Sequence, residues 1–70
     1  MTEIEIYSEY IKLDAFLKYC GAVGTGGEAK LCIAEGQVSV NGEACTQRGK
    51  KLRGGDTVSF RDGRYVVRQA

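Results

Sequence analysis

Histidine and tryptophan are absent from this 70-residue chain, which has two phenylalanines and four tyrosines. Histidine is the commonest general base in enzymes and a frequent zinc ligand, so its absence argues against both catalysis and a zinc site. The three cysteines, Cys20, Cys32 and Cys45, form an odd set without the CxxC spacing of a metal site. We therefore expect no bound metal, and we assign Cys20 and Cys32 to the apolar faces of two helices, where a reduced thiol packs as a small hydrophobic group.

Long hydrophobic runs are also missing, and no basic start leads into an apolar stretch. The sequence thus predicts neither a membrane span nor a secretion signal, and it predicts a cytoplasmic location. Its length corresponds to one domain covering residues 1–70, at a size where no deep catalytic cleft is expected. Apolar residues make up 43% of the chain, which is enough for one core between two thin layers.

Catalytic groups are not assembled in the sequence. The nine carboxylates are scattered over expected helix ends, turns and strand faces, and no serine has a visible basic partner. The segment GTGGEA at 24–29 resembles a dinucleotide-binding fingerprint, but it follows a helical pattern instead of a buried strand. No Gly-Lys-Ser/Thr follows the glycines, which also excludes a phosphate-binding P-loop. We expect a protein that is not an enzyme and that needs no cofactor.

Charge is unevenly distributed although the formal net charge is only +1. Residues 1–35 contain six acidic and three basic side chains, whereas residues 36–70 contain seven basic and three acidic ones. Four of these seven bases lie within the six positions 48–53. Such a segregated field can attract a polyanion at a net charge near zero.

The first half of the chain changes from a strand period to a helix period. Residues 2–7 alternate, with Ile4 and Ile6 on one face and acidic side chains on the other, which predicts a half-buried strand. From Lys12 the apolar spacing is that of a helix that ends at Gly21. Its apolar stripe consists of Leu13, Phe16, Leu17 and Cys20.

A second helix is expected to begin at Thr25, whose hydroxyl can accept from the backbone N–H of Glu28 while Glu28 reaches back. Its stripe of Ala29, Cys32 and Ile33 ends at Gly36. The short connection between the helices predicts a helical hairpin with the two stripes in contact.

Two hairpin turns are expected in the second half. Asn41-Gly42 follows the alternating segment 38–40 and predicts a two-residue turn with a return strand at 44–47. After a loop at 49–55, strands at 57–60 and 65–68 are expected to pair across Asp62-Gly63. The resulting fold class is α+β, a helical hairpin packed on a small, mostly antiparallel sheet.

The basic loop is the candidate binding site. Arg48, Lys50, Lys51 and Arg53 lie in the glycine-punctuated segment QRGKKLRGG, while Lys12 and Lys30 add cations on the two expected helices. Free N–H groups at the start of the second helix can also hold a phosphate oxygen. Two plainer interpretations stay open: a solvated loop kept soluble by charge, and helix-start glycines that only permit a turn. The aromatic side chains of Tyr10, Tyr19 and Tyr65 can stack on bases or simply pack.

An ordered series of short elements resembles one known family. The series is Lys12-Leu13-Asp14, Leu17, Gly21, Thr25, Glu28-Ala29-Lys30, the run GQVSVNG at 36–42, and Gly55-Asp56. It resembles the alpha-L motif, the RNA-binding module named after small-subunit ribosomal protein S4, over a core of about residues 12–60. The segment 46–52 is similar to small free-standing bacterial members that consist of this module alone.

The resemblance implies an RNA surface made by the start of the first helix, the second helix and the following loop. In this chain, the residues that correspond to this RNA surface are Lys12, Thr25, Lys30, Arg48, Lys50, Lys51 and Arg53. Many members carry arginine in the opening of the second helix, where this chain has Gly26 and Gly27. Either backbone N–H groups replace that bidentate phosphate contact or the loop at 48–53 carries more of the binding.

The expected function is binding of structured RNA, with ribosomal RNA or the ribosome as the partner and a role in ribosome assembly or association. We expect a bacterial monomer without a membrane or small-molecule partner. One alternative is a β-grasp-like protein-interaction or carrier module, since VNGE followed by GDTVSF also occurs in ubiquitin-like sulfur carriers. That alternative needs a C-terminal Gly-Gly, whereas the sequence ends RQA. A scaffold that binds another ribosomal factor through the acidic N-terminal strand is a further alternative.

Overall fold

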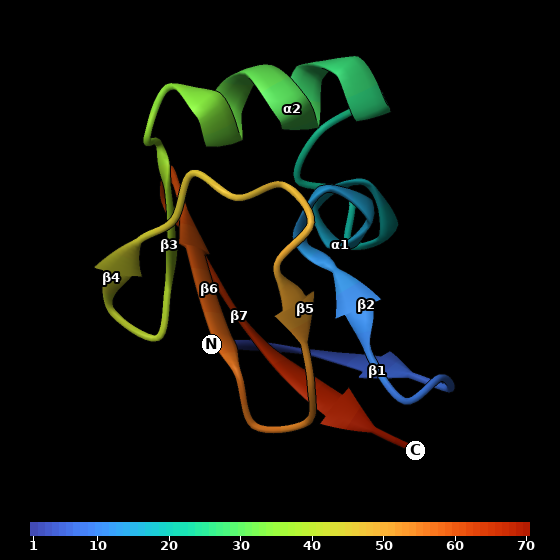
Figure 1. The fold of residues 1–70 in the computed structure, drawn as a ribbon. Helices are drawn as coiled ribbons and strands as arrows, with labels where there is room; N and C mark the ends of the chain where they lie inside the picture. Colours follow the sequence, from blue (N-terminus) through green and yellow to red (C-terminus); the bar gives the residue numbers. More distant parts are fainter.

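Two helices and seven strands follow one another along residues 1–70, all of which the computed structural model describes (Figure 1). Five strands form one sheet in the order β1-β7-β6-β3-β4, in which only β1 and β7 are parallel. The strands β2 and β5 form a separate antiparallel pair. The expected α+β class with a mostly antiparallel sheet is confirmed. The elements are β1 Thr2–Ile6, β2 Ile11–Lys12, α1 Leu13–Tyr19, α2 Gly26–Ala34, β3 Val38–Val40, β4 Glu43–Ala44, β5 Lys51–Leu52, β6 Thr57–Phe60 and β7 Gly63–Gln69.

The two faces of the five-stranded sheet have different environments. Val40, Val58 and Tyr65 form one row across β3, β6 and β7, and this row faces the core. Ser39, Ser59 and Arg64 form the neighbouring row, which points to the other face because side chains alternate along a strand. Glu3, Glu5, Arg64 and Arg68 are all exposed on this second face. The expected acidic outer face of β1 is thus present, and Arg68 forms an ion pair with Glu3 at 3.4 Å.

Fourteen buried side chains form a single core between the sheet and the helices. The predicted stripes are confirmed, with Leu13, Phe16 and Leu17 fully buried on α1. Cys20 is half-buried at the edge of this core, and burial raises the pKa of its thiol. A thiol of this kind stays protonated and packs, as expected. The core consists of Ile6, Leu13, Phe16, Leu17, Val23, Ala29, Cys32, Ile33, Val38, Val40, Leu52, Val58, Phe60 and Val67.

The expected capping box at the start of α2 is present with one change. Thr25 Oγ1 accepts from Glu28 N at 3.1 Å, while Glu28 Oε1 accepts from Gly24 N at 3.1 Å. The Glu28 carboxylate thus accepts from the N–H group one residue before the N-cap residue. Together with the Thr25 bond, it gives the helix start two reciprocal hydrogen bonds. Neither α1 nor α2 has the length and apolar character of a membrane span.

The first hairpin turn has the predicted residues but a shorter return strand. Asn41 and Gly42 have φ values of 52° and 86°, and Val40 pairs with Glu43. The predicted strand at 44–47 is wrong, because a two-residue turn starts the pairing at Glu43 and β4 is only two residues long. After Cys45 N, which donates to Val38 O at 2.9 Å, the chain leaves the sheet.

The second hairpin turn lies one residue earlier than predicted. Phe60 pairs with Gly63, so the two turn residues are Arg61 and Asp62, and the prediction of Asp62-Gly63 is wrong. Arg61 adopts a φ of 56° although it is not glycine. The glycine is required in β7 instead, because a Cβ atom at Gly63 would lie 2.5 Å from Tyr65 Oη. The Tyr65 ring in turn packs edge-on against Phe16, with 6.2 Å between the ring centroids.

Asn41 joins the first hairpin turn to the start of β6, and we expect its replacement to destabilise the fold. Its amide Nδ2 donates to Asp56 Oδ1 at 3.1 Å, and its Oδ1 accepts from Thr57 N at 2.9 Å. Asn41→Gly removes these hydrogen bonds but tolerates the positive φ, so a loss of about 1–2 kcal/mol is expected. Asn41→Ala adds the strain of a left-handed residue, for a total of about 2–3 kcal/mol. Urea unfolding of both variants measures the difference, and equal losses would contradict the strain term.

Candidate nucleic-acid interface

The two-stranded sheet places two lysines opposite each other. Ile11 pairs with Leu52, and Lys12 pairs with Lys51. Leu52 is completely buried and Ile11 is half-buried, so these two side chains face the core and the lysines face solvent. The predicted loop at 49–55 is therefore wrong at Lys51 and Leu52, because two residues per strand are too few to give an alternation pattern.

The loop before β5 caps the first helix with its own carbonyl groups. Lys12 is the N-cap residue of α1, but its side chain makes no cap hydrogen bond. Instead, Leu13 N donates to Lys50 O at 2.9 Å and Asp14 N donates to Arg48 O at 3.1 Å. These bonds satisfy two of the N–H groups that a helix start leaves without partners. They also hold the backbone of Arg48 and Lys50 beside Lys12.

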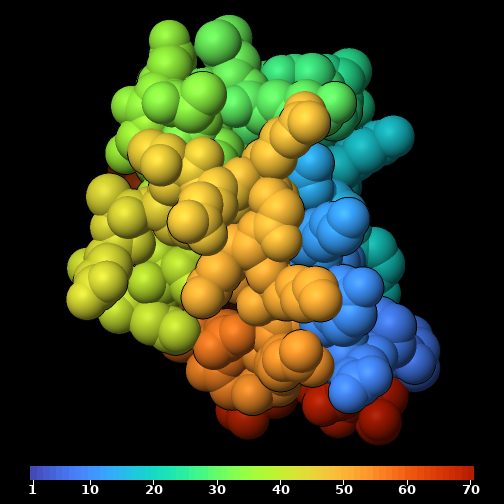
Figure 2. Space-filling model, in the orientation of Figure 1, coloured from blue at the N-terminus to red at the C-terminus, as the bar shows by residue number.

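One face of the molecule therefore collects most of the candidate cations. Figure 2 shows the segment between β4 and β5, in yellow and orange, crossing this face between α2 in green and the β2–α1 segment in blue. Because Leu52 belongs to the core under this segment, the face lies on the opposite side of the core from Arg64 and Arg68. We call this face the basic surface and define it by Lys12, Arg48, Lys50, Lys51 and Arg53, all of which are exposed.

The charges of the basic surface are largely unneutralised. No carboxylate lies within 4.0 Å of the charged groups of Lys12, Arg48, Lys50 or Lys51. Arg53 approaches Glu9 at 3.8 Å, but both side chains are more than half exposed, so the pair contributes little stability. Like charges directly opposite each other across two strands are destabilising. The Lys12–Lys51 pair is thus a site where a bound anion would relieve repulsion.

Tyr10 supports two cations of this surface. Its ring centroid lies 4.8 Å from Lys51 Nζ and 5.5 Å from Arg53 Cζ, distances typical of cation–π contacts. Tyr10 precedes Ile11 and Lys12, so it points to the same outer side as Lys12. Of the other tyrosines considered for base stacking, Tyr65 packs against Phe16, and Tyr19 Oη donates to Glu5 O at 2.8 Å. Both of these are structural contacts.

Thr25 and Lys30 belong to the α2 segment and not to the segments that define the basic surface. The Thr25 hydroxyl is occupied by the α2 cap, and Lys30 is exposed on α2, beside the buried stripe of that helix. Gly26 has open space where a Cβ would be, so packing does not forbid the arginine that many members carry in this opening. A small hollow of about 120 Å³ beside Gly26 is lined by Asp14, Ala15 and Lys18. Asp14 and Lys18 bring one charge of each sign to this hollow, so it adds no net positive charge to the start of α2.

Comparison with known proteins agrees with this geometry. The solution structure of YbcJ from Escherichia coli, described as an alpha-L motif involved in RNA binding, matches with a TM-score of 0.74 and 35% identity over 97% of this chain and 87% of that one. The helical hairpin on its mixed sheet is therefore a module of the alpha-L type. The family model described as "S4 domain" matches residues 4–68. The chain belongs to the S4 domain family, and the predicted resemblance is confirmed.

Two relatives align with most of this chain. "Probable ribosome maturation protein RlbA" of Bacillus subtilis is 44% identical over 57 residues, which cover 81% of this chain and 80% of the relative. "Putative RNA-binding protein YbcJ" of Escherichia coli is 43% identical over 51 residues, or 73% of each chain. Both relatives are bacterial proteins similar in size to this one.

Proposed function

We propose that residues 1–70 act as one non-catalytic RNA-binding domain that binds structured RNA through the basic surface. The observation that carries the proposal is the pairing of Lys12 with Lys51 without a neutralising carboxylate. A phosphate placed between the two ammonium groups would replace a repulsion with two charge-assisted hydrogen bonds. The names of the relatives, which refer to RNA binding and to ribosome maturation, support the same conclusion.

Shape and backbone contacts dominate this proposed mechanism. The basic surface presents cations from β2, the 45–50 loop and β5, and the loop is fixed by its hydrogen bonds to α1. Cations held at fixed positions can follow the spacing of phosphates in a folded RNA, which is how structured RNA is commonly recognised. Lys30 and Thr25 are assigned to the edge of the interface, where a longer RNA would extend along α2.

The proposed target is ribosomal RNA, and the proposed role is ribosome assembly or association in the bacterial cytoplasm by a monomer. RNA crosslinking in cells, followed by sequencing, tests this assignment. Recovery of one ribosomal RNA segment is expected. Recovery of proteins alone would reject it. The β-grasp carrier alternative gains no support, because the family match is to the S4 domain.

Salt should weaken RNA binding steeply. If the five cations of the basic surface each neutralise one phosphate, the logarithm of the association constant is expected to fall against the logarithm of salt with a slope of roughly −3.5 to −4.5. Fluorescence anisotropy with a labelled ribosomal RNA hairpin between low and moderate potassium chloride measures this slope. A slope near zero would exclude phosphate contacts as the main source of affinity.

A further inference from the structure

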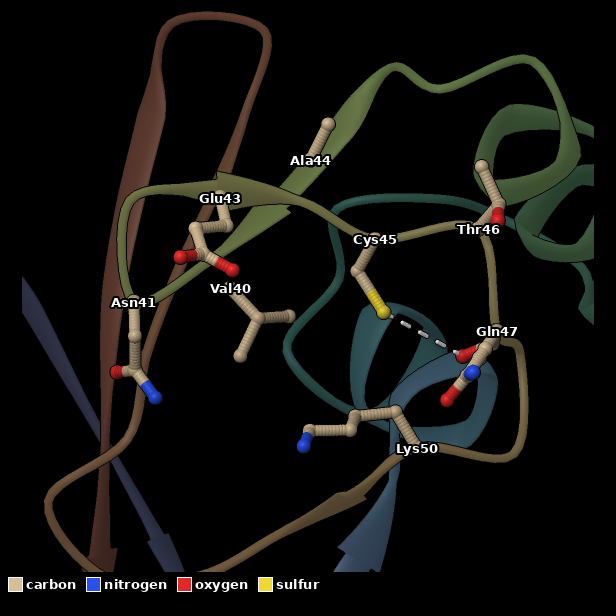
Figure 3. A pocket seen from close by; sticks show the side chains of 8 residues that line it. All are labelled: Val40, Asn41, Glu43, Ala44, Cys45, Thr46, Gln47 and Lys50. Atoms are coloured by element: carbon tan, nitrogen blue, oxygen red, sulfur yellow. Dashed lines mark hydrogen bonds between the residues drawn. The ribbon is translucent and has the colours of Figure 1, made fainter.

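A hollow of about 440 Å³ opens beside the basic surface, between the β3–β4 hairpin and the loop that follows it (Figure 3). Its size is within the range of small-molecule sites. Part of its lining is apolar, including Val40 at 6% exposure, and the rest carries polar side chains. The lining residues are Val40, Asn41, Glu43, Ala44, Cys45, Thr46, Gln47 and Lys50.

Two opposite charges enter this hollow from different elements. Figure 3 shows the Glu43 carboxylate coming from β4 and the Lys50 ammonium coming from the loop, with Val40 between them in the view. Neither group has an ion-pair partner within 4.0 Å, and they do not pair with each other. Asn41, by contrast, is fully engaged with Asp56 and Thr57. The hollow therefore presents the free carboxylate of Glu43 and the free ammonium group of Lys50, beside the Thr46 hydroxyl and the Gln47 amide.

We propose that the hollow binds an unpaired guanine base turned out of the RNA held on the basic surface, an inference that rests on the proposed function. Guanine has two adjacent donors, N1–H and N2–H₂, beside the O6 acceptor on its Watson–Crick edge. A carboxylate accepts two such donors at once, and an ammonium group donates to O6. Adenine, cytosine and uracil each present a single donor group on that edge, so none of them can satisfy both carboxylate oxygens of Glu43 as guanine does.

The position of the hollow fits a base that belongs to bound RNA. Lys50 lines the hollow and is also part of the basic surface, while its carbonyl group caps α1. A nucleotide whose phosphate lies on the basic surface can therefore place its base in the hollow, against Val40 and Cys45. Unpaired bases that leave the stack are the usual source of sequence specificity in RNA recognition.

The test uses RNA hairpins that are identical except for one bulged nucleotide, which is G, A, C, U or abasic. Anisotropy titrations at one salt concentration are expected to show tighter binding of the G bulge by about tenfold or more. Glu43→Gln should remove this preference, because an amide cannot accept both donors. Glu5→Gln on β1, at the opposite edge of the sheet, makes the same charge change and should retain it.

Titration with free nucleosides, followed by amide NMR shifts, separates this inference from the proposed function. Guanosine, which has no phosphate, is expected to shift the amides of residues 43–47 in the natural chain but not in Glu43→Gln, and adenosine should not shift them. Equal RNA affinities for all bulges together with no guanosine shifts would overturn the guanine site and leave the RNA-binding proposal standing. Guanosine shifts without binding of any hairpin would reject both an RNA base as the occupant and the proposed function.

Discussion

Reversing two charges with the double substitution Lys50→Glu and Lys51→Glu is expected to weaken RNA binding by roughly a hundredfold at about 0.1 M salt. Both lysines belong to the basic surface and neither has an ion-pair partner, so the substitutions remove two free positive charges and add two negative ones that would repel RNA. The salt slope should also become shallower by roughly 1.4 to 1.8. Anisotropy titrations of the variant against salt measure both effects.

The matched control is Arg64→Glu with Arg68→Glu, which changes the charge by the same amount. These arginines lie on the other side of the core, on the outer face of the five-stranded sheet. A general attraction between a cationic protein and RNA would respond equally to both double variants. If the interface is confined to the basic surface, only the Lys50/Lys51 variant loses affinity. The Arg64/Arg68 control is then expected to change the affinity by less than about threefold. Equal losses would reject the basic surface as the binding site.

Leu52→Ala is expected to destabilise the fold by about 2–5 kcal/mol, a large share of the stability of so small a domain. Leu52 is completely buried and lies between Lys51 and Arg53 in sequence, so its side chain anchors the basic surface to the core. Its loss leaves a cavity directly beneath β5. Urea unfolding monitored by circular dichroism gives the free energy difference.

Leu31→Ala is the control for this substitution, because Leu31 is 59% exposed on α2. A change within about 0.5 kcal/mol is expected there. The charge-reversal variant of Lys50 and Lys51 should also keep its stability, since both side chains are exposed. Leu52→Ala should weaken RNA binding even at temperatures where it remains folded, because the anchored loop loosens. A stable Leu52→Ala variant would show that the segment is held by backbone bonds alone.

Local patterns were sufficient to predict the helices and the first turn. The stripe Leu13, Phe16 and Leu17 has the helical spacing and is fully buried, and Asn41-Gly42 forms the expected two-residue turn. These features depend on residues within a few positions of each other, where periodicity and turn preference act directly. The same locality explains the correct placement of the α2 cap at Thr25.

Features that depend on distant backbone contacts were not predictable in this way. The β2–β5 pairing and the carbonyl caps from Arg48 and Lys50 join segments that are remote in sequence and have no side-chain signature. The second turn was misplaced because Asp-Gly favours a turn locally, whereas packing of the Tyr65 ring requires Gly63 within β7. The candidate cations were named from the sequence, but only the fold shows that Lys12 pairs with Lys51 and that Lys50 also lines the hollow beside β4.

The carbonyl caps of α1 make the loop before β5 an integral part of the scaffold. In many small domains a recognition loop can be lengthened or exchanged with little effect on the elements that flank it. Here, an insertion between Thr46 and Lys50 would withdraw the acceptors from Leu13 and Asp14 and fray the helix that bears Lys12. Grafting a new specificity onto this protein would therefore have to conserve the length and backbone path of that segment and vary only its side chains.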